Sequence, residues 1–155
     1  MKILRVSLNH HRKAFVIAAL RREYLFPYAK ADPRPSERDP VRHASVDLEI
    51  GREGFTYVLA SGREGSVHIE QVLKYNQDPG HLRERLLYRL TLEARRRVAA
   101  SPLSKREIIR RLGTSAAQFY RLLDPANTRK SVDALLSLLH VLDCDVDLAV
   151  RSRSA

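Results

Sequence analysis

The sequence has a single cysteine, one methionine and no tryptophan among its 155 residues. One thiol cannot form a disulfide within the chain. Cys144 lies in an apolar run, where a small hydrophobic side chain serves equally well. The histidines are scattered without cysteine companions or zinc-ligand spacing. We therefore expect no redox centre, no metal site and no cofactor.

Long hydrophobic runs are also missing. No stretch approaches the roughly 20 apolar residues of a membrane span, and the N-terminus lacks the apolar core of a signal peptide. We therefore expect a cytoplasmic protein without a membrane partner. The sequence shows no nucleophile elbow, no phosphate-binding glycine loop and no carboxylate pair in a perturbing setting. An enzyme is therefore not expected.

Acidic residues are in the minority, with 18 Asp and Glu against 28 Lys and Arg, which gives a net charge of +10. The excess is local. Residues 83–130 carry 13 basic and 4 acidic residues, a net +9, whereas residues 1–82 carry 13 and 10 (+3) and residues 131–155 carry 2 and 4 (−2). Such a concentration of positive charge suits a polyanion such as nucleic acid, although solvated arginine-rich helix faces give the same count.

The first 80 residues have the pattern of a small β-rich domain. Three β-branched or aromatic runs predict an antiparallel meander: residues 2–8, 13–20 and 22–28. Closely spaced prolines and charges predict an irregular loop over residues 30–40. Residues 54–60 and 65–69 flank a glycine-containing turn and predict a hairpin, and a short helix is expected over residues 70–76.

The role of this domain stays open between sensing, dimerisation and partner binding. The run Tyr24-Leu25-Phe26-Pro27-Tyr28 is either an exposed aromatic edge suited to a protein partner or, as is more usual for such a run, part of the core.

The rest of the chain is predicted to be helical. From His81 to Ala100, apolar residues recur at helical spacing: Leu82, Leu86, Leu87, Leu90, Ala94 and Val98. The break at Asp78-Pro79-Gly80 is taken as the domain boundary. The predicted fold class is α+β, with a small antiparallel β-rich domain over residues 1–80 followed by an all-α domain over residues 81–155.

A pair of short helices is predicted next. Ser104 and Glu107 have the spacing of a capping box, which starts a helix at Lys105. Gly113 permits the left-handed conformation that ends a helix, and Ser115 can cap the following one. Three apolar residues hold this second helix against the first: Phe119, Leu122 and Leu123.

The turn Leu112-Gly113-Thr114-Ser115 resembles the core of the Cro/lambda-repressor-like (Xre) helix-turn-helix family. The likeness extends to a helix capped by Ser131, with an apolar face of Val132, Leu135, Leu136, Leu139 and Leu142. It implies a small bacterial transcriptional regulator that binds double-stranded DNA as a homodimer, as a repressor that is autoregulating or antitoxin-like. The chain also loosely resembles bacterial proteins in which a β-rich domain of unknown function precedes a helix-turn-helix.

The resemblance also implies which side chains meet DNA. The base-contacting candidates are Gln118, Tyr120, Arg121, Ala116 and Ala117. The phosphate-contacting candidates are Lys105, Arg106, Arg110, Ser115, Asn127, Thr128, Arg129 and Lys130. Family members often carry polar residues at the two alanine positions, which here offer only apolar contact, for example to a thymine methyl group.

A protein-interaction module is the alternative: an antitoxin-like inhibitor or adaptor whose first domain binds a partner and whose helical domain only dimerises. Residues 145–151, in which the run Val-Asp-Leu-Ala-Val is flanked by charged residues, are either an edge strand for dimerisation or a cover for the protein's own core. The sequence does not distinguish these two roles.

Overall fold

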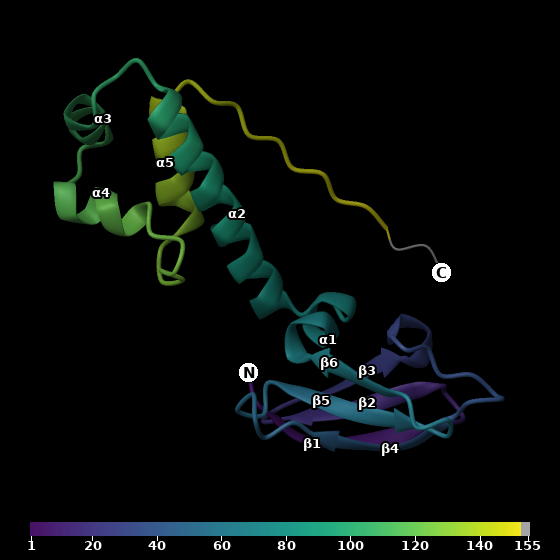
Figure 1. Ribbon diagram of the computed structural model, residues 1–155. Coiled ribbons are helices and arrows are strands. Elements are labelled where there is room, and N and C mark those ends of the chain that lie inside the picture. Colours follow the sequence, from purple (N-terminus) through teal and green to yellow (C-terminus); the bar gives the residue numbers. More distant parts are fainter. Residues whose placement is uncertain (153–155) are drawn as a thin grey trace. The chain divides into compact units, whose positions relative to one another are not determined.

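The computed structural model describes residues 1–152 and shows an α+β protein (Figure 1). Within that range it contains two antiparallel three-stranded sheets and five α-helices, which confirms that the class is α+β. The chain divides into two compact units, residues 1–82 and residues 83 onward. All the strands of the described range lie in the first unit. Across residues 1–152, no helix is both long and apolar enough to cross a bilayer.

The first sheet is the predicted meander. Strands β1 (Ile3–Asn9), β2 (Ala14–Ala19) and β3 (Glu23–Pro27) pair antiparallel in that order. Side chains of β2 alternate in burial, with Phe15 and Ile17 fully buried. This alternation places one face of the sheet against the core, as expected for a half-buried antiparallel sheet.

The second sheet contains the predicted hairpin and one further strand. Strands β5 (Gly54–Leu59) and β6 (Glu64–His68) form the hairpin, and β4 (Val41–Val46) pairs with the other edge of β5. The sequence does not predict β4, because only Val41 among its residues is buried and a bulge between Val41 and His43 interrupts the apolar alternation.

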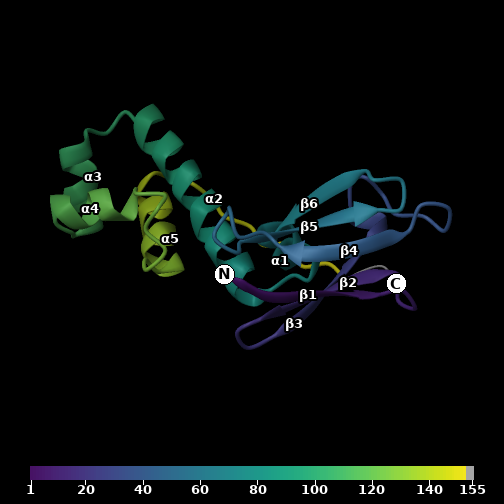
Figure 2. The same ribbon diagram turned by 60° about the horizontal axis from the view of Figure 1, so that its bottom comes forward.

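The two sheets form two layers of the first unit (Figure 2). Aromatic side chains between the sheets form its core. The ring of Phe15 lies 4.9 Å from that of Phe55 and 5.0 Å from that of Tyr57, measured between centroids. Helix α1 (Ile69–Tyr75) adds buried aliphatic side chains to this cluster. Tyr24, Phe26 and Tyr28 are buried in it as well, so the aromatic run at residues 24–28 is core and not an exposed binding edge.

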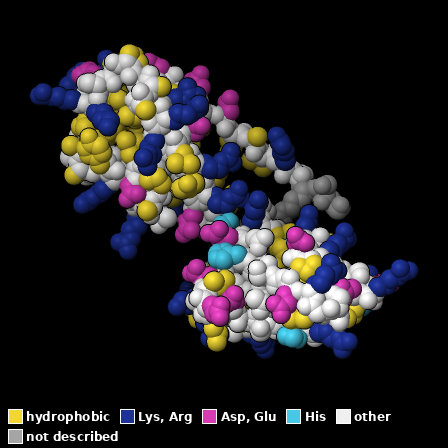
Figure 3. Space-filling view, in the orientation of Figure 1, with side chains coloured by type: hydrophobic (Ala, Val, Ile, Leu, Met, Phe, Trp, Pro, Cys, Tyr) yellow, Lys and Arg dark blue, Asp and Glu magenta, His cyan; other side chains and the backbone are white. Residues whose placement is uncertain are grey.

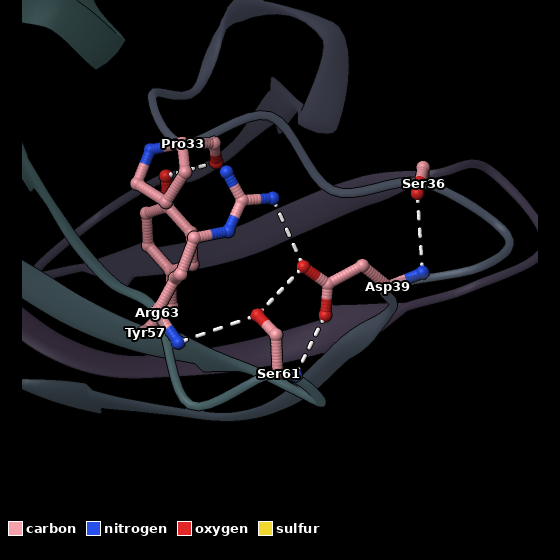
Figure 4. Close-up of polar contacts among 6 residues, drawn as sticks. All are labelled: Pro33, Ser36, Asp39, Tyr57, Ser61 and Arg63. Atoms are coloured by element: carbon pink, nitrogen blue, oxygen red, sulfur yellow. Dashed lines mark hydrogen bonds and ion pairs between the residues drawn. The ribbon is translucent and has the colours of Figure 1, made fainter.

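The loop over residues 30–40 is irregular apart from the end of a short 3-10 helix, Tyr28–Lys30. Side-chain hydrogen bonds attach this loop to β5 and to the turn that follows it (Figure 4). The carboxylate of Asp39 accepts hydrogen bonds from the amide and hydroxyl of Ser61, both at 2.7 Å, and from Arg63 at 2.9 Å. The Tyr57 hydroxyl donates to the carbonyl of Pro33 at 2.6 Å. The loop is therefore anchored although it has no regular structure.

Helix α2 (Pro79–Ala100) starts earlier than predicted, because Asp78-Pro79-Gly80 opens the helix and does not interrupt the chain before it. Asp78 accepts a hydrogen bond from the amide of His81, and proline is well tolerated in a first turn. Of the predicted apolar face, Leu87, Ala94 and Val98 are buried, whereas Leu82 and Leu86 are exposed. Thr91 is buried instead, and its hydroxyl donates to the carbonyl of Leu87 at 2.6 Å.

Three shorter helices complete the second unit: α3 (Lys105–Leu112), α4 (Ala116–Leu122) and α5 (Val132–Val141). Their buried residues join those of α2 in one cluster. The face predicted for α5 is only partly right. Leu135 and Leu139 are buried together with Leu138, whereas Val132 and Leu136 are exposed. Leu135, Leu138 and Leu139 have the i, i+3, i+4 spacing that forms one helical stripe.

Residues 145–152 follow α5 without forming a helix or strand, and all of them are exposed. The possibility that residues 145–151 cover the protein's own core is therefore wrong. Their apolar side chains lie in solvent in this structure.

The contact between Gly65 and Tyr57 leads to a first prediction. A Cβ atom at Gly65 would lie 2.3 Å from the Tyr57 ring, which is fully buried and cannot move aside without disturbing the core. We expect Gly65→Ala to lower the free energy of unfolding by about 1–3 kcal/mol, the usual cost of overpacking. Urea denaturation followed by circular dichroism measures it. Ser66→Ala, at the exposed next position, is the control, and equal stability of the two variants would contradict the prediction.

Candidate nucleic-acid interface

Helix α3 begins at Ser104 as predicted. The Ser104 hydroxyl oxygen accepts a hydrogen bond from the amide of Glu107 at 3.1 Å. The reciprocal half of the predicted capping box is not formed. The carboxylate of Glu107 instead accepts from the guanidinium groups of Arg110, at 2.9 Å from Nε, and Arg111, at 3.0 Å from Nε. These hydrogen bonds hold the pKa of Glu107 at about 2.

The turn between α3 and α4 has the predicted form. Gly113 ends α3 with φ 69° and ψ 33°, in the left-handed region. A Cβ atom at this position would meet no neighbouring atom within 4 Å, so glycine is favoured here for its backbone conformation and not for lack of space. Ser115 caps α4, and its hydroxyl oxygen accepts from the amide of Gln118 at 3.2 Å. Two short helices are thus joined by only three residues.

Helix α4 has one buried and one exposed face. Phe119 and Leu122 are buried in the cluster that also holds Ile108 of α3, and Leu123 is half-buried. The five predicted base-contacting residues are all exposed: Ala116, Ala117, Gln118, Tyr120 and Arg121. The predicted division of this helix into an anchoring face and an outward face is confirmed.

The three outward residues with polar side chains line two different clefts. Gln118 and Arg121 line one cleft, of about 410 Å³, together with Asn127. The hydroxyl of Thr114 donates to the side-chain oxygen of Gln118 at 2.7 Å and orients that amide. Tyr120 lines a different hollow, of about 430 Å³, together with Lys105. The structure thus brings Gln118 and Arg121 together and separates them from Tyr120.

Lys105 lies close to Tyr120. Its ammonium lies 5.9 Å from the centre of the exposed Tyr120 ring, within the range of a cation–π contact. Arg106 is exposed on the same helix. Arg110 is exposed too, but its charge is offset by the nearby carboxylate of Glu107. Two of the three basic candidates on α3 therefore present an unopposed charge.

The loop after α4 contributes less than predicted. Thr128 and Arg129 are exposed, whereas the side chain of Asn127 bonds within the loop, donating to the carbonyl of Arg121 and accepting from the amide of Arg129. Lys130 is only 8% exposed. Its ammonium donates to the carbonyls of Leu122, at 2.9 Å, and Asp124, at 2.7 Å, and burial lowers its pKa. The Lys130 ammonium is therefore not available to contact phosphate, and the prediction for this residue is wrong.

Arg83 is a structural residue of this region that the sequence pattern does not identify. Its guanidinium donates to the carbonyls of Thr128, at 3.1 Å, and Lys130, at 3.4 Å, and so ties the loop to α2. In the sequence Arg83 is one of several arginines on a helix, and nothing separates it from those that are simply solvated.

The surface of the second unit is rich in cationic side chains, which Figure 3 shows distributed over the face in view. This agrees with the net charge of +9 over residues 83–130. Within residues 1–152, no group of three or more His, Cys, Asp or Glu side chains is arranged to hold a metal ion.

Comparison with protein-family models, curated proteins and solved structures yields no match to this chain. The likeness to the Cro/lambda-repressor-like family therefore depends on the residues of the turn and the helices around it.

The low pKa of Glu107 predicts a pH-dependent stability. A carboxylate whose pKa is lowered in the folded state stabilises it above the ordinary pKa, near 4.5, and loses this effect as the pH falls through about 2. We expect Glu107→Gln to lower the thermal midpoint above about pH 5, and the difference from the unaltered protein to vanish near pH 2. Glu84→Gln, on the exposed surface of α2, is the control. A difference that does not change with pH would contradict this account.

Proposed function

We propose that the protein binds specific double-stranded DNA sequences through α4, and that it is a small bacterial transcriptional regulator. The observation that carries the proposal is the geometry of α4. A short turn at Gly113 and burial of Phe119 hold this helix so that Ala116, Ala117, Gln118, Tyr120 and Arg121 face outward. The helix belongs to the segment that carries most of the chain's positive charge. The likeness of the turn to the Cro/lambda-repressor-like family supports the same function.

Base recognition is assigned to the outward face of α4. The major groove admits an α-helix, an amide side chain reads adenine and a guanidinium reads guanine. Because Gln118 and Arg121 line the same cleft, we expect them to contact neighbouring base pairs. Ala116 and Ala117 contribute apolar contact to thymine methyl groups.

Backbone contacts are assigned to the exposed cationic and polar side chains around α4. Lys105 and Arg106 lie on α3, which precedes α4 in the chain, and Thr128 and Arg129 follow α4 in the loop. Such contacts set the register of a protein on DNA without reading its sequence. One short helix reads few bases, so we propose a homodimer that places two copies of α4 about 34 Å apart, one helical turn of DNA. The first unit then serves sensing, dimerisation or binding of a protein partner.

Fluorescence anisotropy on labelled DNA tests this function. The protein is titrated onto the DNA upstream of its own gene and onto a scrambled duplex, each at two salt concentrations. Phosphate contacts make affinity fall steeply with salt, so salt-sensitive binding that prefers the upstream fragment supports an autoregulating repressor. Absence of binding at low salt would instead favour the protein-interaction module.

Arg121 is predicted to determine base preference. We expect Arg121→Ala to reduce discrimination at one base pair by about 1–3 kcal/mol while binding to other sequences changes little. Competition with single-base variants of the preferred site measures this. Arg42→Ala, an exposed arginine of β4, is the control and is expected to have no effect. Unchanged preference in the Arg121 variant would rule out the proposed orientation of α4.

Lys105 is predicted to contact phosphate. We expect Lys105→Ala to weaken binding to all sequences alike and to reduce the slope of log affinity against log salt by about 1. The same titrations over a salt series provide the slope, with Lys74→Ala, an exposed lysine of α1, as the control. An effect on one sequence alone would assign Lys105 to base recognition.

A further inference from the structure

The segment after α5 has the pattern of a strand but no strand to pair with. Apolar residues occupy every second position, at Val146, Leu148 and Val150. These side chains are 49%, 85% and 86% exposed. Charged residues alternate with them at Asp145, Asp147 and Arg151. In an extended chain successive side chains point to opposite faces, so this segment has one apolar face and one face that carries the three charges together with Ala149.

The backbone of this segment is unpaired as well. The last backbone hydrogen bond of the described chain runs from the amide of Cys144 to the carbonyl of Leu139, at 2.9 Å. Beyond it, no backbone hydrogen bond joins residues 145–152 to one another or to any other residue of the range 1–152. An exposed apolar segment with free amides and carbonyls is a template for pairing with another strand.

The charges of the segment are complementary to those of a second copy. In an antiparallel pair centred on Leu148, each Asp145 lies opposite Arg151 of the other copy. Val146 lies opposite Val150, and the two Leu148 side chains face each other. Opposite charges and apolar side chains placed directly across a strand pair are each stabilising.

We propose that residues 145–151 form a homodimer interface, as a two-stranded antiparallel ribbon with the same segment of a second copy, centred on Leu148. The arrangement has two-fold symmetry, in which the same patch of both chains meets itself. In this arrangement the exposed apolar side chains of one copy lie beside those of the other.

The charge pattern also selects the register. Centring the pair on Asp147 places the two Asp147 carboxylates opposite each other, which is destabilising. Centring it on Ala149 keeps opposite charges together but places Val146 across from Ser152, with the loss of an apolar pair. Of these three centres, Leu148 is the one that pairs every apolar side chain of Val146, Leu148 and Val150 with another of them and also pairs Asp145 with Arg151, while Asp147 lies opposite Ala149.

The ribbon is expected to form a reversible dimer, because two strands alone are marginally stable in water. Dimerisation through this ribbon does not require DNA, so it is measured on the protein alone. If no dimer forms through this segment, the anisotropy titrations still test whether the single chain binds DNA.

Cysteine cross-linking tests the interface and its register. The full chain carries Cys144→Ser together with either Leu148→Cys or Ala149→Cys. Residues directly opposite in an antiparallel pair have Cα atoms about 4.5–5.5 Å apart, within the range of a disulfide, whereas diagonal pairs lie beyond it. Under mild oxidation we expect Leu148→Cys to form a disulfide-linked dimer at least about tenfold faster than Ala149→Cys. Equal rates, or a faster rate for Ala149→Cys, would overturn the proposal.

A charge exchange provides an independent test. Asp145→Arg alone and Arg151→Asp alone each place like charges opposite one another at two symmetric positions. Each is expected to raise the dimer dissociation constant by about tenfold in sedimentation velocity, and the double variant is expected to restore it. Because the segment lies outside the packed core, circular dichroism is expected to show the same fold in all three. Failure of the double variant to recover dimerisation would overturn the proposed pairing.

Discussion

Burial of Phe119 determines how α4 presents its other face. Seven residues are too few for a helix to be stable alone in water, so α4 depends on the packing of its inner side. Phe119 and Leu122 supply that packing as members of a buried cluster that also contains residues of three other helices. The left-handed backbone at Gly113 then lets α4 follow α3 after a single short turn. The proposed DNA-reading surface is thus a product of packing on the opposite side of the helix.

The basic residues of the second unit have different structural roles. Lys105, Arg106 and Arg121 are exposed, whereas Arg110 and Arg111 pair with Glu107. Lys130 satisfies the carbonyl groups at the end of α4, and Arg83 satisfies those of the loop that follows. The count of 13 basic residues over residues 83–130 therefore overstates the number of cationic side chains available to a polyanion.

The elements that the sequence predicts well are those with local signals. Ser104, Gly113 and Ser115 act through neighbouring backbone groups, so their residue types identify the helix ends directly. Strand β4 escapes prediction because only one of its residues is buried and a bulge interrupts its alternation. Lys130 escapes prediction because its burial depends on the loop after α4 returning to the end of that helix. Residues 145–152 have a strand pattern but no partner strand within the described chain.

The two alanines at the start of α4 have a different consequence. Ala116 and Ala117 are exposed, and neither side chain takes part in the packing or hydrogen bonding that holds the helix. Many side chains that favour helices can replace them without loss of stability, since substitutions at such surface positions usually change it little. For a helix in the proposed role, these are the positions at which new binding specificities can evolve, or be engineered, while the scaffold stays unchanged.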